Sequence, residues 1–248
     1  MMTLRLADLA QVLDARLIGG DHEITAVSTD TRTLGKGALF VALRGERFDA
    51  HDFCDQAVQA GASALLVERE LPLAIPQLVV ADTLKGLGRL GKLVRERINP
   101  KVLAITGSCG KTTVKEMATA ILRQEGEVLA TAGNFNNEVG VPLTLLRLEA
   151  QHQFAVMELG ANHPGEIAWT TSLAQPDAAI INNVAAAHLE GFGSLEGVFH
   201  AKSEIFEGLG EGGTAIVNAD NEFWPKWQEK GIRCAFSLED QSQPFHAR

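Results

Sequence analysis

The chain has 248 residues, of which 46% are apolar, so it can bury a core as one large domain or two small ones. It carries 22 basic and 31 acidic residues, and the net charge of −9 argues against a general affinity for nucleic acids or anionic membranes. No stretch approaches the roughly 18 to 20 consecutive apolar residues that a membrane span requires. Asp8 and Asp14 lie within an amphipathic pattern near the start, which predicts a first helix rather than a signal peptide.

The cysteines indicate a reducing compartment. Cys54, Cys109 and Cys234 are odd in number, far apart, and form neither a CxxC pair nor a Cys/His spacing typical of zinc sites. A disulfide framework is therefore not expected. Because no signal peptide is expected either, the sequence predicts a cytoplasmic protein.

Strand and helix patterns alternate in the first part of the chain. Apolar runs that end at polar or glycine-containing turns predict strands over residues 24–32, 38–43, 64–68 and 77–82. A polar loop is expected over 44–51, and a helix over 51–62, which Gly61 ends. This alternation predicts a small first domain over residues 1–82, a mixed α/β fold on a parallel or mixed sheet.

The second part of the chain continues this alternation over a longer stretch. A helix over residues 82–100 leads into it. Strands are predicted at 101–106, 127–131, 154–159, 177–183, 214–218 and 233–237, and helices near 111–124, 138–148, 165–174, 195–209 and 221–230. This order predicts a doubly wound, mostly parallel α/β domain over residues 83–248. Residues 237–248 are polar and show no capped element, so we interpret them as a short tail or as the cut end of a longer parent.

Residues 101–122, KVLAITGSCGKTTVKEMATAIL, hold the strongest functional motif. A buried strand leads into a tight loop with Gly107 and Gly110, and Lys111 then opens a helix. Glycines let backbone N–H groups turn inward around phosphate oxygens, and the start of a helix adds the positive end of its dipole. The pattern is the shorter GxxGKTT form of a P-loop, which predicts Lys111 on the β- and γ-phosphates and the Thr112 hydroxyl on Mg²⁺. The alternative is a chance glycine-rich turn.

Glu158 ends the buried strand FAVMEL. A carboxylate at the carboxyl end of a parallel strand lies at the edge where open α/β sheets bind ligands, and Mg²⁺ prefers oxygen donors. Beside a P-loop, this favours a metal ligand over an acid that faces solvent. His188 follows another strand end, and Lys202 lies in the next helix. Their spacing alone does not indicate a functional role, because a lone histidine is more often structural and a lone lysine on a helix is usually solvated.

The stretch NFNNEVGVP places three amides before a predicted helix that begins at Glu138: Asn134, Asn136 and Asn137. Such amides either cap the helix or contact a polar ligand. In the first domain, four residues with phosphate-binding side chains lie on loops: Thr31, Arg32, Arg44 and Arg47. Arginine recognises phosphate in a bidentate way, and the alternative is a surface scatter of arginines.

Together these segments resemble the Mur ligases, the ATP-dependent amide-forming enzymes of peptidoglycan precursor synthesis. Six stretches carry the resemblance in collinear order: STDTRTLGKGALFVALRGERFDAHDF, TGSCGKTTVKEM, NFNNEVGVPLTLL, MELGANHPGEI, NNVAAAHLEGFGSLEGVFHAKSEIF and NADN. Within the family, the sequences of these stretches are similar to those of the member that joins D-Ala-D-Ala to UDP-MurNAc-tripeptide. A folylpolyglutamate-synthase-like ligase is the alternative, which STDTR and RFDAHDF disfavour.

The resemblance implies a role for each motif. ATP would be bound by Gly107, Ser108, Cys109, Gly110, Lys111, Thr112 and Thr113, and Mg²⁺ by Thr112, Glu158 and His188. A carbamylated Lys202 would help hold a second Mg²⁺. The catalytic residues would be Lys111, His188 and Lys202. Substrate would be bound by Thr31, Arg32, Arg44, Gly45, Asn136 and Asn137. Cys109 stands where the family has serine or asparagine.

The resemblance also implies a mechanism through an acyl phosphate, formed from the tripeptide carboxylate and ATP and attacked by the amine of D-Ala-D-Ala. Family members have three domains and run well beyond 248 residues, so we expect an incomplete central domain and no C-terminal domain here. A truncated, non-catalytic module that binds UDP-MurNAc-peptide is therefore a second hypothesis. A monomer without nucleic-acid or membrane partners is expected.

Overall fold

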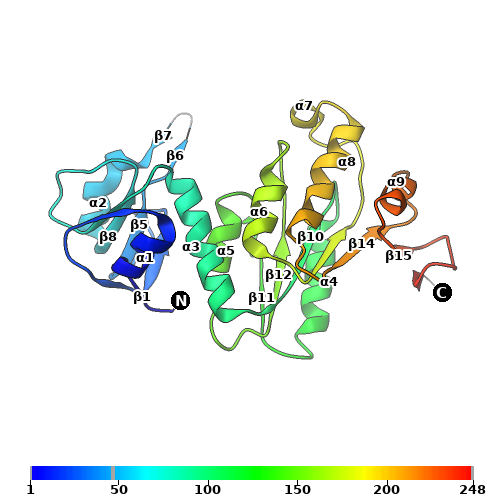
Figure 1. The fold of residues 1–248 in the computed structure, drawn as a ribbon, viewed down its shortest axis with the longest axis horizontal. Coiled ribbons are helices and arrows are strands. Elements are labelled where there is room, and N and C mark those ends of the chain that lie inside the picture. Colours follow the sequence, from blue (N-terminus) through cyan, green and yellow to red (C-terminus); the bar gives the residue numbers. More distant parts are fainter. Residues whose placement is uncertain (1, 46–47, 247–248) are drawn as a thin grey trace. The chain divides into compact units, whose positions relative to one another are not determined.

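A computed structural model describes residues 2–45 and 48–246, and their contacts divide the chain into two compact units (Figure 1). The first unit holds the described residues up to Arg97 together with Leu145–Glu149. The second holds Ile98–Thr144 and the described residues from Ala150 onward. The sequence predicts a boundary between residues 82 and 83, whereas contacts group the helix α3 (Thr83–Ile98), except its last residue, with the first unit. One reason is that Thr83 Oγ1 donates to the carbonyl of Ala42 at 2.9 Å.

The first unit is built on a mixed sheet with the order β2-β9-β8-β5-β4, in which only the β2–β9 pair is antiparallel. The strands of the whole unit are β1 (Leu4–Arg5), β2 (Arg16–Ile18), β3 (Glu23–Ile24), β4 (Ala26–Ser28), β5 (Ala38–Val41), β6 (Arg44–Gly45), β7 (Phe48–Asp49), β8 (Ala62–Val67) and β9 (Gln77–Val79), of which β1 pairs with β3 and β6 with β7 outside this sheet. Its other helices are α1 (Leu6–Leu13), the 3-10 turn η1 (Ala50–Phe53) and α2 (Cys54–Ala60). The predicted mixed α/β fold is confirmed.

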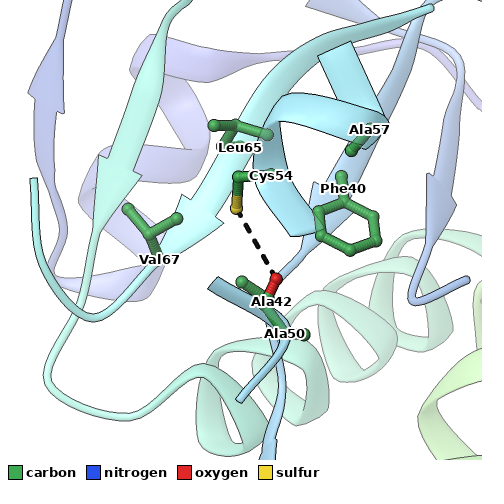
Figure 2. Close-up of a cluster of buried hydrophobic side chains, with 7 residues drawn as sticks. All are labelled: Phe40, Ala42, Ala50, Cys54, Ala57, Leu65 and Val67. Atoms are coloured by element: carbon green, nitrogen blue, oxygen red, sulfur yellow. Dashed lines mark hydrogen bonds between the residues drawn. The ribbon is translucent and has the colours of Figure 1, made fainter. Parts of the chain in front are cut away.

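Part of the core of this unit lies between β5, β8 and α2 (Figure 2). The cluster consists of Phe40, Ala42, Ala50, Cys54, Ala57, Leu65 and Val67. Cys54 Sγ donates to the Ala50 carbonyl at 3.8 Å, and burial raises the pKa of the thiol to about 11, so it stays protonated and behaves as a small apolar group. Gly61 ends α2 at φ +107°, a conformation that favours glycine.

One segment of the first unit differs from its prediction. Residues 44–51 were expected as a polar loop, but β6 and β7 pair antiparallel, with Arg44 opposite Asp49 and Gly45 opposite Phe48. The ladder is two residues long and its side chains are mostly exposed, so no apolar alternation in the sequence marks it. Arg47 lies outside the described residues.

The second unit is a parallel sheet with the order β11-β12-β10-β13-β14-β15-β16. Its strands are β10 (Lys101–Thr106), β11 (Val128–Ala130), β12 (Phe154–Glu158), β13 (Ala178–Ile181), β14 (Thr214–Asn218), β15 (Cys234–Ser237) and β16 (Phe245–His246). β16 lies in the polar segment 237–248, for which the sequence shows no capped element and predicts a short tail or the cut end of a longer parent. The two residues of β16 pair with Phe236 and Ser237 through the backbone alone, and both side chains are exposed.

Helices lie on both faces of this sheet, as a doubly wound fold predicts (Figure 1). They are α4 (Lys111–Leu122), α5 (Gly140–Leu145), α6 (Glu166–Ala174), α7 (Leu189–Phe192), α8 (Leu195–Ser203), the 3-10 turn η2 (Glu204–Gly208) and α9 (Trp224–Glu229). Two connections run in opposite directions along the strand order of the sheet. One leads from β10 through α4 to β11, and the other leads from β12 through α6 to β13. Right-handed crossovers therefore put α4 and α6 on opposite faces.

This topology places the carboxyl ends of three neighbouring strands at one edge. β10 lies between β12 and β13 and is parallel to both, so the segments that follow Thr106, Glu158 and Ile181 begin side by side. This is the edge at which open α/β sheets bind ligands. Among the described residues, no helix combines the length and apolar character needed to cross a bilayer.

Candidate functional site

The loop after β10 joins the strand to α4 through Gly110, which has φ +74° and lies directly before the helix. An added Cβ on this residue would lie 2.9 Å from Nδ2 of Asn182, so both backbone conformation and space require glycine. Val114 N makes the first backbone hydrogen bond of the helix, to the carbonyl of Gly110 at 3.1 Å. The N–H groups of the preceding first turn have no acceptor within the helix, which is the arrangement that binds an anion.

Lys111 occupies the first position of α4. Its Nζ donates to the carbonyl of Gly107 at 2.9 Å, so the amine lies back over the loop. A phosphate held by the loop would offer this ammonium a charged acceptor in place of a neutral carbonyl, and hydrogen bonds between charged groups are stronger.

Three of the predicted site residues meet at Glu158. Thr112 Oγ1 donates to Glu158 Oε2 at 2.9 Å, and Asn136 Nδ2 donates to Glu158 Oε1 at 2.8 Å. The Glu158 residue is 2% exposed, so its carboxylate is held in one place. A hydroxyl, a carboxylate and an amide supply oxygen donors of the kind that Mg²⁺ binds, and this donor set fits the metal.

Within residues 2–45 and 48–246, no three His, Cys, Asp or Glu side chains are grouped so as to hold a metal ion. A metal at Glu158 would therefore take at most one further His, Cys, Asp or Glu ligand from these residues, and its remaining ligands would be hydroxyls, water, nucleotide oxygens or a modified side chain. This is the usual situation for Mg²⁺, which keeps several waters and takes one or two carboxylates.

The two predicted asparagines before α5 have different contacts. Asn137 Oδ1 accepts hydrogen bonds from Gly140 N at 2.8 Å and from Val139 N at 3.3 Å, so it caps the start of α5. Asn136 packs on Gly160, whose N–H donates to the Asn136 carbonyl at 2.8 Å and whose added Cβ would lie 3.1 Å from Asn136 Cγ. The close approach to a glycine fixes Asn136 where it reaches Glu158.

His188 and Lys202 are not hydrogen-bonded to this cluster in the described part of the chain. His188 is exposed, has φ +53°, and its carbonyl accepts bonds from the first turn of α7. Lys202 is 2% exposed on α8, with its amine 5.6 Å from the centre of the Phe192 ring. Burial, with repulsion from the Lys111 ammonium, lowers the pKa of Lys202 to about 8.

Two site residues went unassigned in the sequence. Asn183 Oδ1 accepts hydrogen bonds from Ser108 N at 3.1 Å and Cys109 N at 3.0 Å. The carboxamide nitrogens of Asn182 and Asn183 both donate to the Cys109 carbonyl, at 2.7 Å and 3.0 Å. These bonds hold the first half of the loop between β10 and α4. Consecutive asparagines directly after a strand that neighbours the P-loop strand were the available signal.

The first unit has a cavity of about 490 Å³ of its own. Its lining includes the polar turn residues Asp30, Thr31 and Arg32 and the aromatic residues Phe48 and Phe53. The two rings stack with centres 5.3 Å apart and planes 23° from parallel. The cavity thus combines a flat apolar surface with a cationic side chain.

The two described arginines of the predicted site in the first unit, Arg32 and Arg44, each lie close to a carboxylate. Arg32 Nη2 is 2.6 Å from Asp30 Oδ2, and hydrogen bonds from Arg32 lower the pKa of Asp30 to about 2. Arg44 Nη1 lies 3.8 Å from Glu68 Oε2, and Arg44 and Gly45 are not among the described residues that line the cavity.

Comparison with protein families matches both parts of the chain. Residues 23–103 match the model described as Mur ligase family, catalytic domain, and residues 105–247 match the Mur ligase middle domain. The UDP-N-acetylmuramoyl-tripeptide--D-alanyl-D-alanine ligase of Escherichia coli (strain K12) is 59% identical over 228 residues, which are 92% of this chain and 50% of the relative. The enzyme of the same name from Haemophilus influenzae is 54% identical over 236 residues, 93% of this chain and 52% of the relative.

Solved structures agree with the fold. A crystal structure of MurF from Acinetobacter baumannii superposes with a TM-score of 0.90 at 43% identity, over 97% of this chain and 54% of that one. MurF of Thermotoga maritima in complex with ADP gives a TM-score of 0.80 at 32% identity, over 87% of this chain and 51% of that one. The chain spans about half the length of the curated relatives that it matches. With two family models matched in order along it, the chain belongs to the Mur ligase family.

Proposed function

We propose that this chain is the nucleotide-binding part of an ATP-dependent ligase that joins D-Ala-D-Ala to UDP-MurNAc-tripeptide in the cytoplasm. In this proposal residues 1–82 bind the UDP end of the substrate and residues 83–248 bind ATP. The observation that carries it is the contact between Thr112 and Glu158 beside a glycine loop that opens α4. The names of the relatives, at 59% and 54% identity, support the choice of substrates.

ATP binding is assigned to Gly107–Thr113. The free N–H groups at the start of α4 would hold phosphate oxygens, and the helix dipole adds to their attraction. Lys111 would exchange its contact with the Gly107 carbonyl for the β- and γ-phosphates. The complex of the Thermotoga maritima relative with ADP supports this assignment.

Mg²⁺ is assigned to Thr112, Glu158 and His188, and a second Mg²⁺ to Lys202. When bound, the ions would neutralise charge on the reacting phosphates. Lys202 would take part as a carbamate, formed when its neutral amine adds to CO₂ with loss of a proton. A pKa of about 8 leaves about a tenth of the amine neutral at pH 7, far more than for an exposed lysine. Its burial supports this role.

The UDP end of the substrate is assigned to the cavity of the first unit. The stacked Phe48 and Phe53 offer an aromatic surface to a pyrimidine ring, and Arg32 offers a bidentate donor to a diphosphate. Thr31 lines the same cavity. Arg44, Gly45, Asn136 and Asn137 remain proposed contacts to other parts of the substrate.

The proposed reaction runs in two steps. The terminal carboxylate of the tripeptide attacks the γ-phosphorus of ATP, and the bond to the bridging oxygen breaks to release ADP. The amine of D-Ala-D-Ala then attacks the acyl carbon, which expels phosphate and leaves the amide after loss of a proton. Lys111 would stabilise the negative charge that accumulates around the transferred phosphoryl group.

Calorimetry on two variants, each of which is expected to lose affinity for one of the two ligands, tests the proposal. We expect Lys111→Ala to weaken binding of Mg-ATP by about 10- to 100-fold, since a charged hydrogen bond is worth about 1.5 to 3 kcal/mol. The same variant should bind UDP-MurNAc-tripeptide normally. Arg32→Ala should show the opposite pattern. If both variants lose both ligands, or neither loses any, the assignment of one ligand to each unit is wrong.

A further inference from the structure

Lys115 is a buried charge that the proposed mechanism does not use. It lies on α4 one turn after Lys111, and its side chain is only 3% exposed. Burying an ammonium costs several kcal/mol unless hydrogen bonds and an opposite charge compensate. Its Nζ lies 2.7 Å from Oε1 of Glu116, a side chain that is 62% exposed, so the ion pair itself lies toward solvent.

The other contact of this ammonium points into the protein. Lys115 Nζ donates to the carbonyl of Thr131 at 2.8 Å. Thr131 is 1% exposed and follows β11 directly. β11 is a three-residue strand at the edge of the described sheet, where it pairs with β12 only. The end of a short edge strand is held by few hydrogen bonds and opens easily. The hydrogen bond from α4 therefore stabilises the end of β11.

Thr131 connects this restraint to the backbone of Glu158, the residue whose carboxylate is assigned to Mg²⁺. Its N–H donates to the Val156 carbonyl at 3.0 Å, and its Oγ1 accepts from the backbone N–H of Glu158 at 3.0 Å. An unbroken path of hydrogen bonds therefore runs from Lys115 through Thr131 to Glu158. Among the described residues, the hydrogen bonds of the Lys115 ammonium do not reach the carboxylate, Thr112 or Asn136.

We propose that Lys115 is a positioning residue for Glu158 and acts through Thr131 to hold the carboxylate in place for Mg²⁺. This inference rests on the proposed function, which assigns the metal to Glu158. Residues that orient a metal ligand without touching the metal commonly change affinity about 10- to 100-fold. The purely structural alternative is that the hydrogen bond to Thr131 stabilises the fold and does nothing for the site.

Three variants of the chain separate these possibilities. Lys115→Met removes the ammonium but keeps an unbranched side chain of similar length. Thr131→Val removes only the hydroxyl, since the carbonyl that Lys115 bonds to belongs to the backbone. Thr170→Val is the matched control, because Thr170 is also fully buried in the second unit but bonds within α6. If Lys115→Met does not fold, Lys115→Leu, which also lacks an N–H donor, takes its place.

The first measurement needs no ligand. Hydrogen exchange of the Glu158 amide, followed by NMR, should become faster in Lys115→Met and in Thr131→Val relative to the global exchange rate. The second measurement is the Mg²⁺ concentration that gives half-maximal ATP binding. It should rise about tenfold in both variants, while ATP binding in excess EDTA stays unchanged. The double variant should resemble the single ones, because both substitutions break the same path.

Each outcome of these measurements either supports the inference or overturns it. If Lys115→Met exchanges its Glu158 amide at the parental rate, or if its Mg²⁺ requirement matches that of Thr170→Val, the inference is overturned. Glu158→Gln tells this failure apart from failure of the proposed function. If Glu158→Gln abolishes the Mg²⁺ requirement while Lys115→Met leaves it unchanged, only the inference fails. If Glu158→Gln has no effect on Mg²⁺, the metal assignment and the inference fall together.

Discussion

Thr112 Oγ1 and Glu158 Oε2 are 2.9 Å apart, which joins the first turn of α4 to the carboxyl end of β12. The two residues come from motifs far apart in the sequence. The parallel pairing of β10 with β12, in which Ile105 lies opposite Glu158, brings them together. The contact fixes the carboxylate beside the start of α4, where the phosphates of a nucleotide are proposed to bind.

We therefore expect Glu158→Gln to separate metal binding from phosphate binding. The amide has the same shape and can still contact Thr112, but it lacks the charge that attracts Mg²⁺. ATP affinity in EDTA should equal that of the parent, while the gain in affinity on adding Mg²⁺ should disappear. Calorimetry at several Mg²⁺ concentrations measures both. A variant that loses affinity in EDTA to the same extent would place Glu158 in the support of the loop instead.

Lys202 provides a pH-dependent prediction. Burial and the nearby Lys111 lower its pKa to about 8, so the neutral amine increases as the pH rises through that value and decreases below it. Carbamate formation should follow the neutral amine, from little at pH 6 to much at pH 9. Carbon NMR with labelled bicarbonate should show a carbamate signal that Lys202→Ala removes. The exposed Lys101 is the control, because Lys101→Ala should leave that signal unchanged. A signal that survives in Lys202→Ala would belong to another amine.

The pairing of Asp49 with His51 makes the first unit sensitive to acid. The backbone N–H of His51, with its ring and Arg69, lowers the pKa of Asp49 to about 2. Because this folded-state pKa lies below the unfolded value near 3.8, the stabilisation is present above pH 4 and is lost as the pH falls toward 2. His51 Nε2 accepts from Glu68 N at 2.8 Å, so the ring ties the segment after β7 to the end of β8.

Asp49→Asn should lower Tm at pH 7 by about 2 to 4 °C, as expected for loss of about 1 kcal/mol. Its stability should also fall less steeply than that of the parent between pH 4 and pH 2. Asp52→Asn is the control, since the Asp52 side chain is 74% exposed and its nearest cation is 4.0 Å away. Thermal melts across this pH range decide the matter, and parallel curves for Asp49→Asn and the parent would contradict the assignment.

The sequence predicts those parts of the site that depend on local pattern. The strand before Gly107, the helix after Gly110 and the carboxylate at the end of FAVMEL are each visible within a few residues. The parallel sheet then places them together without further information. The predicted fold is confirmed for the same reason, since its predicted strands are apolar runs bounded by turns.

Other features depend on contacts between distant segments. Spacing alone suggests that Lys202 is solvated, yet packing of α8 buries it beside Phe192. Lys115 follows the P-loop in an ordinary helical pattern, and only its contact with Thr131 reveals a buried role. The bonds from Asn183 to the loop join residues 74 and 75 positions apart. Neither periodicity nor composition records such pairings.

The aromatic pair of the first unit provides the last prediction. Phe48 and Phe53 stack beside the turn that holds Arg32, and both line the cavity. If a pyrimidine ring packs on this surface, Phe53→Ala should weaken binding of UDP-MurNAc-tripeptide about 3- to 10-fold, because an aromatic contact is worth about 0.5 to 1.5 kcal/mol. Binding of Mg-ATP should not change.

Phe135→Ala is the control, since Phe135 is 47% exposed in the second unit. Titration with UMP and with ribose 5-phosphate isolates the base, because only UMP carries the ring. The expected result is a loss for UMP alone, and equal losses for both ligands would show that Phe53 supports the cavity without contacting the base.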